Sequence, residues 1–138
     1  ITNLTPRAQG GDVTVDEEKD MFIAVDFDDT IVKNVYPNIG DPLPYALDTL
    51  RELIRNGHRI ILWTMRSGYN LTEAVKFLEK NGIKIYGANC HKTQWKWTSS
   101  PKLYSDFFID DRNIGTNLIN GAVDWLYIRE QLKEKKLL

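Results

Sequence analysis

The chain has 138 residues, of which 42% are hydrophobic and 27% charged, and its formal net charge is −1. These values are typical of one globular domain that buries its own core. They exclude a bulk field that would draw the chain onto nucleic acid or an anionic membrane, so nucleic-acid binding would need a local basic patch. No apolar run approaches the roughly 20 residues of a membrane span. Cys90 is the single cysteine, which excludes an intrachain disulfide and favours a reducing, cytoplasmic setting.

Residues 1–20 are polar and include a glycine pair and an acidic run. We expect them to form an N-terminal extension, either a flexible segment or a tag remnant, and we assign them no chemistry. They lack the basic and then apolar pattern of a secretory signal. A single domain is expected over residues 21–138.

Strands and helices are predicted to alternate along this domain. In chain order we expect a strand at 21–25, a helix from 45 to 54, a strand at 59–63, a helix at 71–80, strands at 83–86 and 106–109, and a closing helix at 122–135. The first strand is a continuous apolar run, typical of a strand buried on both faces. The alternation predicts an α/β fold, a three-layer Rossmann-like sandwich with a mostly parallel central sheet and helices on both faces.

The longest stretch without clear structure is 87–102, and a loop of that length in a compact domain is usually functional or disordered. It contains Trp95 and Trp97, which alternate with lysines. These indoles would suit stacking on a base or sugar ring of a substrate. The alternative, which we favour slightly, is that they pack the loop onto the body or onto a partner chain in a homo-oligomer.

Polar side chains gather where the predicted strands end. Because ligands bind at the carboxyl ends of strands in open α/β sheets, we expect these side chains to meet at one edge. They are Asp26 and Asp28 after the first strand, Thr64 and Arg66 after the second, Lys102 before the fourth, and Asp110 and Asp111 after it. Converging carboxylates repel one another, and Mg²⁺ would relieve that repulsion. A lysine, a hydroxyl and backbone N–H groups would suit phosphate oxygens, so the edge is predicted to perform phosphoryl transfer with a carboxylate nucleophile.

In their order along the chain, these motifs resemble those of the haloacid dehalogenase superfamily of phosphohydrolases. That family has an Asp-x-Asp-x-Thr motif, matched by Asp26, Asp28 and Thr30, and its second motif is matched by Thr64. The third and fourth motifs, a lysine and an acidic pair, are matched by Lys102 and by Asp110-Asp111. The match spans residues 21–115.

The resemblance implies a role for each acid. Asp26 would be the nucleophile and a metal ligand, and Asp28 the general acid/base that also lends its backbone carbonyl to the metal. Asp110 and Asp111 would complete the Mg²⁺ site, with Asp111 favoured as the direct ligand.

Thr64 and Lys102 would bind the phosphoryl group, although Lys92 and Lys96 lie in the same loop as Lys102. Arg66 is a further candidate for phosphate contact, with an exposed arginine of no special role as the equal alternative. Thr30 and Asp29 are expected to support the loop.

No cap domain is expected, because 31–45 is too short for one and 64–102 holds only one helix, one strand and a loop. The pattern therefore resembles small capless phosphatases of bacteria and phages. Such relatives typically take substrate from an open site, often from a macromolecule, or complete the site through oligomerisation.

The leading hypothesis is thus a phosphomonoester hydrolase, with a nucleotide, a nucleic-acid end or a sugar phosphate as substrate. A phospho-receiver signalling domain is disfavoured, because its acceptor aspartate ends the third strand and Gly87-Ala88-Asn89 stand there. A catalytically inactive phosphate-binding module remains an alternative.

Overall fold

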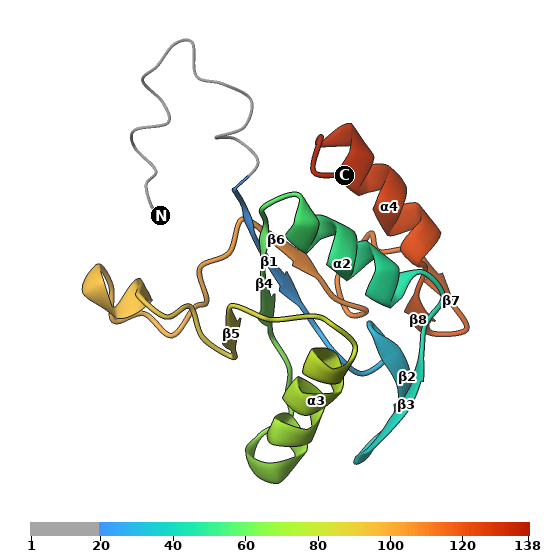
Figure 1. Ribbon diagram of the computed structural model, residues 1–138, viewed down its shortest axis with the longest axis horizontal. Coiled ribbons are helices and arrows are strands. Elements are labelled where there is room, and N and C mark those ends of the chain that lie inside the picture. Colours follow the sequence, from blue (N-terminus) through green and yellow to red (C-terminus); the bar gives the residue numbers. More distant parts are fainter. Residues whose placement is uncertain (1–19) are drawn as a thin grey trace.

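A central parallel sheet of four strands, in the order β5-β4-β1-β6, organises the molecule (Figure 1). The computed structural model describes residues 20–138, so the extension expected over 1–20 lies, apart from Asp20, outside the described residues. The strands are β1 (Phe22–Val25), β4 (Arg59–Leu62), β5 (Gly87–Ala88) and β6 (Phe107–Ile109). Since β1 lies between β4 and β6, the residues that follow these three strands emerge side by side.

Three helices and two small hairpins complete the described chain. The helices are α2 (Ala46–Arg55), α3 (Gly68–Lys80) and α4 (Trp125–Glu134). The antiparallel hairpins are β2 (Val32–Val35) with β3 (Asn38–Pro42), and β7 (Leu118–Ile119) with β8 (Ala122–Val123). Neither hairpin was expected from the sequence, because their strands are short and carry polar residues.

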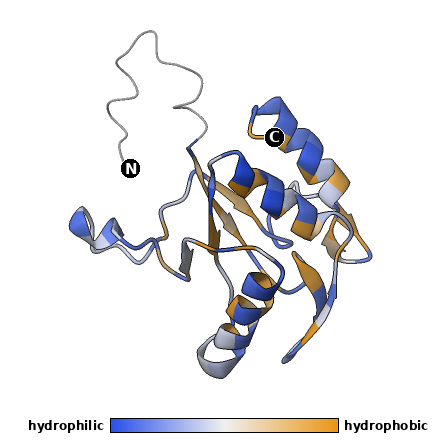
Figure 2. Cartoon of the chain, viewed as in Figure 1, coloured by the Kyte–Doolittle hydropathy of each residue, from blue (hydrophilic) through white to orange (hydrophobic). Residues whose placement is uncertain are grey.

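All three helices pack on one face of the sheet. Along β1, Ile23 and Val25 belong to the larger buried cluster, and Phe22 and Ala24 to a smaller one. Successive strand residues point to opposite faces, so the two clusters lie on opposite sides of the sheet. The helices enter the larger cluster through Ala46, Leu50 and Leu53 of α2, Ala74 and Leu78 of α3, and Trp125, Ile128 and Leu132 of α4. Figure 2 shows the central strands as mostly hydrophobic and the helices as two-sided.

The other face is covered by the segment that connects β5 to β6. Its buried cluster is Phe22, Ala24, Ile61 and Leu103. Within this segment, which is described throughout, the one helix is the 3-10 turn η2 (Gln94–Lys96). The α/β, Rossmann-like fold class is confirmed, but the α-helices expected on both faces lie on one. The reason is topological: β1, β4 and β5 advance in one direction, so right-handed crossovers place α2 and α3 on the same side.

Two predicted boundaries were wrong. The third strand was expected at 83–86, but pairing with β4 begins at Gly87. A Cβ at Gly87 would lie 2.4 Å from the Cys90 carbonyl oxygen, so the tight turn after β5 requires glycine there. The closing helix was expected from Ala122, which instead lies in β8. The helix begins at Trp125, where the Asp124 carboxylate accepts hydrogen bonds from the Leu126 and Tyr127 N–H groups.

Between β1 and β4 the described chain holds only the β2–β3 hairpin and α2, and between β4 and β5 only α3. Both insertions are too small to form a further domain. Among residues 20–138 the structure contains no helix with the length and apolar character of a membrane span. Within residues 20–138, the chain that follows β1 at the carboxyl edge forms a turn and then the β2–β3 hairpin, and the Val123 N–H of β8 donates to the Asp29 carbonyl in that turn.

Candidate functional site

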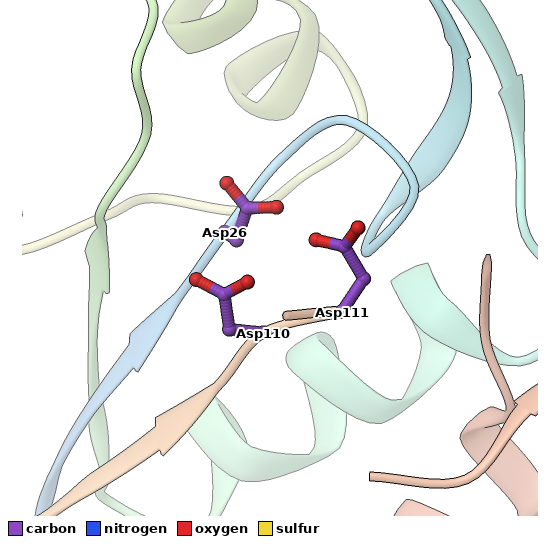
Figure 3. A group of neighbouring side chains, drawn as sticks. All are labelled: Asp26, Asp110 and Asp111. Atoms are coloured by element: carbon purple, nitrogen blue, oxygen red, sulfur yellow. The ribbon is translucent and has the colours of Figure 1, made fainter. Parts of the chain in front are cut away.

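Three carboxylates converge at the carboxyl edge of the sheet. Asp26 directly follows β1, and its N–H donates to the Ile109 carbonyl at 3.0 Å, which extends the pairing of β1 with β6. Asp110 and Asp111 directly follow β6. One carboxylate oxygen from each of Asp26, Asp110 and Asp111 lies within 4.8 Å of the other two, and each residue is partly buried (Figure 3). We call these three residues the acidic triad.

Thr30 connects two members of the acidic triad through its side-chain hydroxyl. Its hydroxyl lies 2.9 Å from an Asp26 carboxylate oxygen and 3.3 Å from an Asp111 carboxylate oxygen, and it accepts a hydrogen bond from the Asp111 N–H at 3.1 Å. The Trp125 indole N–H donates to the Thr30 carbonyl. Thr30 is fully buried. The sequence suggested only loop support, and the structure makes Thr30 the residue that positions two of the three acids.

The turn between these residues is shaped by Asp29, as expected. Asp29 adopts a left-handed backbone with a φ of 62°. Its N–H donates to the Val32 carbonyl, and its carboxylate accepts from the Asn34 N–H at 3.0 Å. Aspartate tolerates this conformation because its side chain bonds the local backbone.

The triad carries more negative charge than its surroundings balance. Burial, followed by the neighbouring Asp110 carboxylate, raises the pKa of Asp26 to about 7. Burial is also the main cause that raises the pKa of Asp110. Among residues 20–138, no lysine, arginine or histidine forms an ion pair with any of the three acids. The charge of Arg112 acts against the rise in the pKa of Asp110 without forming an ion pair. Clustered carboxylate oxygens that form no ion pair are a donor set that fits a hard divalent cation such as Mg²⁺.

Asp28 lies outside the triad and has its own cation. Its two carboxylate oxygens accept hydrogen bonds from Nε and Nη2 of Arg66, both at 2.8 Å. The Arg66 side chain is 1% exposed and that of Asp28 is 17% exposed. This bidentate geometry is the strongest form of an arginine–carboxylate pair.

The structure contradicts the alternative of an exposed Arg66, because Arg66 is buried and its donors meet protein acceptors. A guanidinium has five N–H donors. Besides Asp28, these donors meet the carbonyls of Pro37, Asn38 and Asn70. The rings of Phe27 and Tyr36 each lie with their centroid 5.0 Å from the guanidinium carbon. With its donors engaged and both rings packed against it, Arg66 fastens the β2–β3 hairpin to Asp28.

Thr64 occupies the predicted place at the end of β4. Its N–H donates to the Asn89 side-chain oxygen at 2.8 Å, and its hydroxyl oxygen accepts from the Arg66 N–H at 3.1 Å. The Asn89 side-chain amide also donates to the Arg66 carbonyl. The Thr64 hydroxyl hydrogen has no acceptor among residues 20–138, which leaves it able to bond a phosphate oxygen. Asn89 was not singled out from the sequence, and its position after a predicted strand was the available signal.

Lys102 and the two loop tryptophans lie on the face opposite the helices. Lys102 is exposed, and its ammonium forms no ion pair among residues 20–138. Trp97 packs edge-on against His91 and Tyr104, as the packing alternative requires. Trp95 is 73% exposed and free to contact a ligand. The two tryptophans therefore differ in their surroundings: Trp97 packs against other rings, and Trp95 is exposed.

The fold has a close counterpart among solved structures. A conserved protein from Bacteroides thetaiotaomicron is 45% identical in sequence and superposes with a TM-score of 0.74, covering 84% of this chain and 92% of that chain. No family model and no curated protein matches the chain.

Proposed function

We propose that this chain, which belongs to the same family as the conserved Bacteroides thetaiotaomicron protein, is a Mg²⁺-dependent phosphomonoester hydrolase. In this proposal it is a capless member of the haloacid dehalogenase superfamily with Asp26 as its nucleophile. The observation that carries the proposal is the acidic triad at the carboxyl edge of the sheet, which is held by Thr30 and forms no ion pair with a cation among residues 20–138.

Asp26, Asp110 and Asp111 would hold the Mg²⁺ ion. When bound, Mg²⁺ supplies positive charge that lowers the repulsion between an anionic nucleophile and an anionic phosphate. The raised pKa of Asp26, about 7, has burial as its main cause and the Asp110 carboxylate as the second. Those surroundings support a cation requirement for an ionised Asp26.

The reaction would proceed in two displacements on phosphorus. A carboxylate oxygen of Asp26 attacks the phosphorus, the ester P–O bond breaks, and the leaving oxygen takes a proton from Asp28. A water oxygen then attacks the aspartyl-phosphate, its proton passes to Asp28, and the bond between phosphorus and Asp26 breaks. The products are an alcohol and inorganic phosphate, and both aspartates return to their starting forms.

The pair between Asp28 and Arg66 affects the two displacements differently, because Asp28 gives up a proton in the first and takes one up in the second. The second half uses Asp28 as an ionised carboxylate, which is the form that pairs with arginine. In the first half Asp28 must carry a proton while it faces a fixed cation. We therefore expect aryl phosphates, whose leaving groups need little protonation, to turn over faster than alkyl phosphates.

The direct test is release of phosphate from p-nitrophenyl phosphate with Mg²⁺. Asp26→Asn is expected to lower kcat by about 10³-fold or more, as removal of a nucleophile commonly does. Asp41→Asn serves as the control, because Asp41 is an exposed acid on β3. Equal rates for wild type and Asp26→Asn would exclude Asp26 as the nucleophile.

A second candidate is a catalytically inactive phosphate-binding module. Two observations favour this inactive module: Asp28 is paired with Arg66, and Lys102 is exposed. Binding of Mg²⁺ without hydrolysis across a broad panel of phosphate esters would identify this alternative. In either case we propose a phosphorylated small molecule or nucleotide as partner and a cytoplasmic setting, and leave a homo-oligomer to be tested.

A further inference from the structure

A pocket of about 280 Å³ lies between the central sheet and the segment that connects β5 to β6. Its lining residues are Trp63, Asn89, Cys90, His91, Gln94, Trp95, Thr98, Ser99, Ser100, Pro101 and Leu103. The volume is near the lower end of the range of small-molecule sites. Apart from Trp63, the lining residues lie in the stretch 89–103, which has no periodic pattern from which a pocket could be predicted.

The pocket adjoins the catalytic edge. Trp63 directly follows β4, and its N–H donates to the carbonyl of Val25, the residue before Asp26. Asn89 follows β5 and bonds the Thr64 N–H, so one side chain touches both the pocket and the loop proposed to bind phosphate. Trp63 and Asn89, which follow β4 and β5, therefore connect the pocket to the carboxyl edge of the sheet.

The lining combines flat apolar surfaces with neutral hydrogen-bonding groups. None of the lining residues is Asp, Glu, Lys or Arg. Two indoles, those of Trp63 and Trp95, offer ring surfaces, and the amides of Asn89 and Gln94 offer donors and acceptors. An uncharged lining of this kind favours a planar, neutral and polar group over a carboxylate, an ammonium or a plain alkyl chain.

His91 lines the pocket, and its ring also packs against neighbouring aromatic rings, those of Phe22, Tyr86, Trp97 and Tyr104. The ring is 6% exposed, and its Nε2 is buried without a hydrogen-bond partner among residues 20–138. Nδ1 accepts from the Thr93 N–H, so in the neutral ring Nε2 carries the hydrogen. Burial lowers the pKa of His91, which favours this neutral form. A neutral imidazole leaves the lining without charge at this position, which suits an uncharged ligand group.

The surface around the pocket is positively charged. From Cys90 to Ser105 the chain contains three lysines and no acid: Lys92, Lys96 and Lys102. Lys102 stands between two lining residues, and the Lys96 ammonium lies 5.8 Å from the ring centroid of Trp95. Figure 2 shows the tip of this segment as hydrophilic. A neutral pocket with a basic rim suits a neutral ring system attached to phosphate.

We propose that this pocket receives the nucleobase of the substrate, with Trp95 as its stacking surface. The proposal rests on the phosphomonoester hydrolase function proposed above and narrows the substrate to phosphorylated nucleosides. The nucleobase belongs either to a free nucleoside monophosphate or to the phosphorylated end of a nucleic acid, because both present the same chemistry to the pocket.

Binding to the Asp26→Asn variant in the presence of Mg²⁺ tests the pocket without hydrolysis. Adenosine 5′-monophosphate and ribose 5-phosphate share sugar and phosphate and differ by the base. By calorimetry, the nucleotide is expected to bind at least about fivefold more tightly, as one stacked base contributes. Adding Trp95→Ala is expected to weaken nucleotide binding by about 5- to 100-fold and to leave ribose 5-phosphate binding unchanged.

Tyr127→Ala in the same background is the matched control, since it removes a partly exposed ring from α4. A 5′-phosphorylated tetranucleotide separates the two sources of the base: tighter, salt-sensitive binding than the mononucleotide indicates a nucleic-acid end, and equal binding indicates a free nucleotide. Equal affinity for the nucleotide and ribose 5-phosphate, or an equal loss of both in Trp95→Ala, overturns the proposal. Turnover of p-nitrophenyl phosphate by wild type decides the hydrolase function separately.

Discussion

Asp26 and Asp28 are two residues apart and have opposite electrostatic surroundings. Asp28 is paired with Arg66, a buried cation that the fold supplies. Asp26 faces two further carboxylates and has no described protein cation, so burial and charge raise its pKa to about 7. A permanent cation fixes the position of a side chain, whereas an unbalanced acidic group leaves room for a cation from solution. Asp28 is therefore held by a protein cation, whereas the acidic triad has carboxylate oxygens available to bind a cation from solution.

Removing the permanent cation is expected to have the largest effect on stability. Arg66→Met leaves Asp28 without its partner and releases the carbonyls of the β2–β3 hairpin. Loss of one member of a buried pair typically costs about 3–5 kcal/mol. Urea denaturation should show a loss of this size in the free energy of unfolding.

Two further variants sharpen this measurement. Lys76→Met removes one member of an exposed pair on α3 and should change stability by less than about 1 kcal/mol. Asp28→Asn combined with Arg66→Met removes the unpaired charge and should recover part of the loss. If the double variant were no more stable than Arg66→Met, the uncompensated charge of Asp28 would not be the cause.

Loosening the acidic triad is expected to have the next largest effect. Thr30→Val keeps the shape of a buried side chain but removes the hydroxyl that contacts Asp26 and Asp111. We expect a loss of about 1–3 kcal/mol in stability and a decrease of about 10- to 100-fold in Mg²⁺ affinity, measured by calorimetry.

Thr49→Val is the matched control for this variant. Thr49 is also fully buried, and its hydroxyl bonds the Tyr45 carbonyl and Arg129. A similar loss of stability with unchanged Mg²⁺ affinity is expected. Equal Mg²⁺ affinities for the two valine variants would show that Thr30 does not position the triad.

The sequence predicted the triad but not the pair. Asp26, Asp110 and Asp111 each end a strand that is recognisable from its apolar run, and parallel strands bring their carboxyl ends to one edge. Arg66 stands in a polar turn beside Ser67 and Gly68, where an arginine is usually exposed. Its burial depends on carbonyls of a hairpin that has no apolar alternation, so local pattern could not show it.

The same physical limit applies to the face opposite the helices. Helical periodicity located α2 and α3 within a few residues, because each buries an apolar stripe. The segment from Cys90 to Ser105 packs through aromatic side chains at irregular spacing, such as Trp97 against His91 and Tyr104. Neither its path nor the pocket beneath it follows from a periodic pattern.

Adding Mg²⁺ should produce a smaller, pH-dependent effect on stability. The pKa of Asp26 is raised in the folded state from 3.8 to about 7, so between these values the folded protein binds more protons than the unfolded chain. Stability of the metal-free protein should therefore fall as pH rises from about 4 to about 7. At pH 8, Mg²⁺ at ten times its Kd should add about 1.4 kcal/mol, and at pH 5 it should add little, because protons compete with the ion.

Thermal melts with and without Mg²⁺ at both pH values measure this difference. Asp26→Asn removes the titrating group, so its metal-free stability should lose the decline between pH 4 and 7 that Asp26 causes. A Mg²⁺ stabilisation that is the same at pH 5 and pH 8 would contradict the assignment of the cation site to the triad.

The smallest effect is expected at Lys102, which is where resemblance and structure diverge most. The family motif implies that this lysine binds the phosphoryl group. In that position its positive charge would also offset the negative charge of the acidic triad. In the structure it is exposed, and its backbone is held through Ser100 and Gln94 beside the pocket.

An exposed charge contributes up to about 1 kcal/mol, so Lys102→Ala should lower kcat/KM for p-nitrophenyl phosphate by less than about tenfold. Lys92→Ala, in the same segment, should leave this substrate unaffected. A decrease of about 10³-fold in Lys102→Ala alone would mean that the loop carries Lys102 to the triad during the reaction, and Asp26 would then gain a permanent cation as Asp28 has.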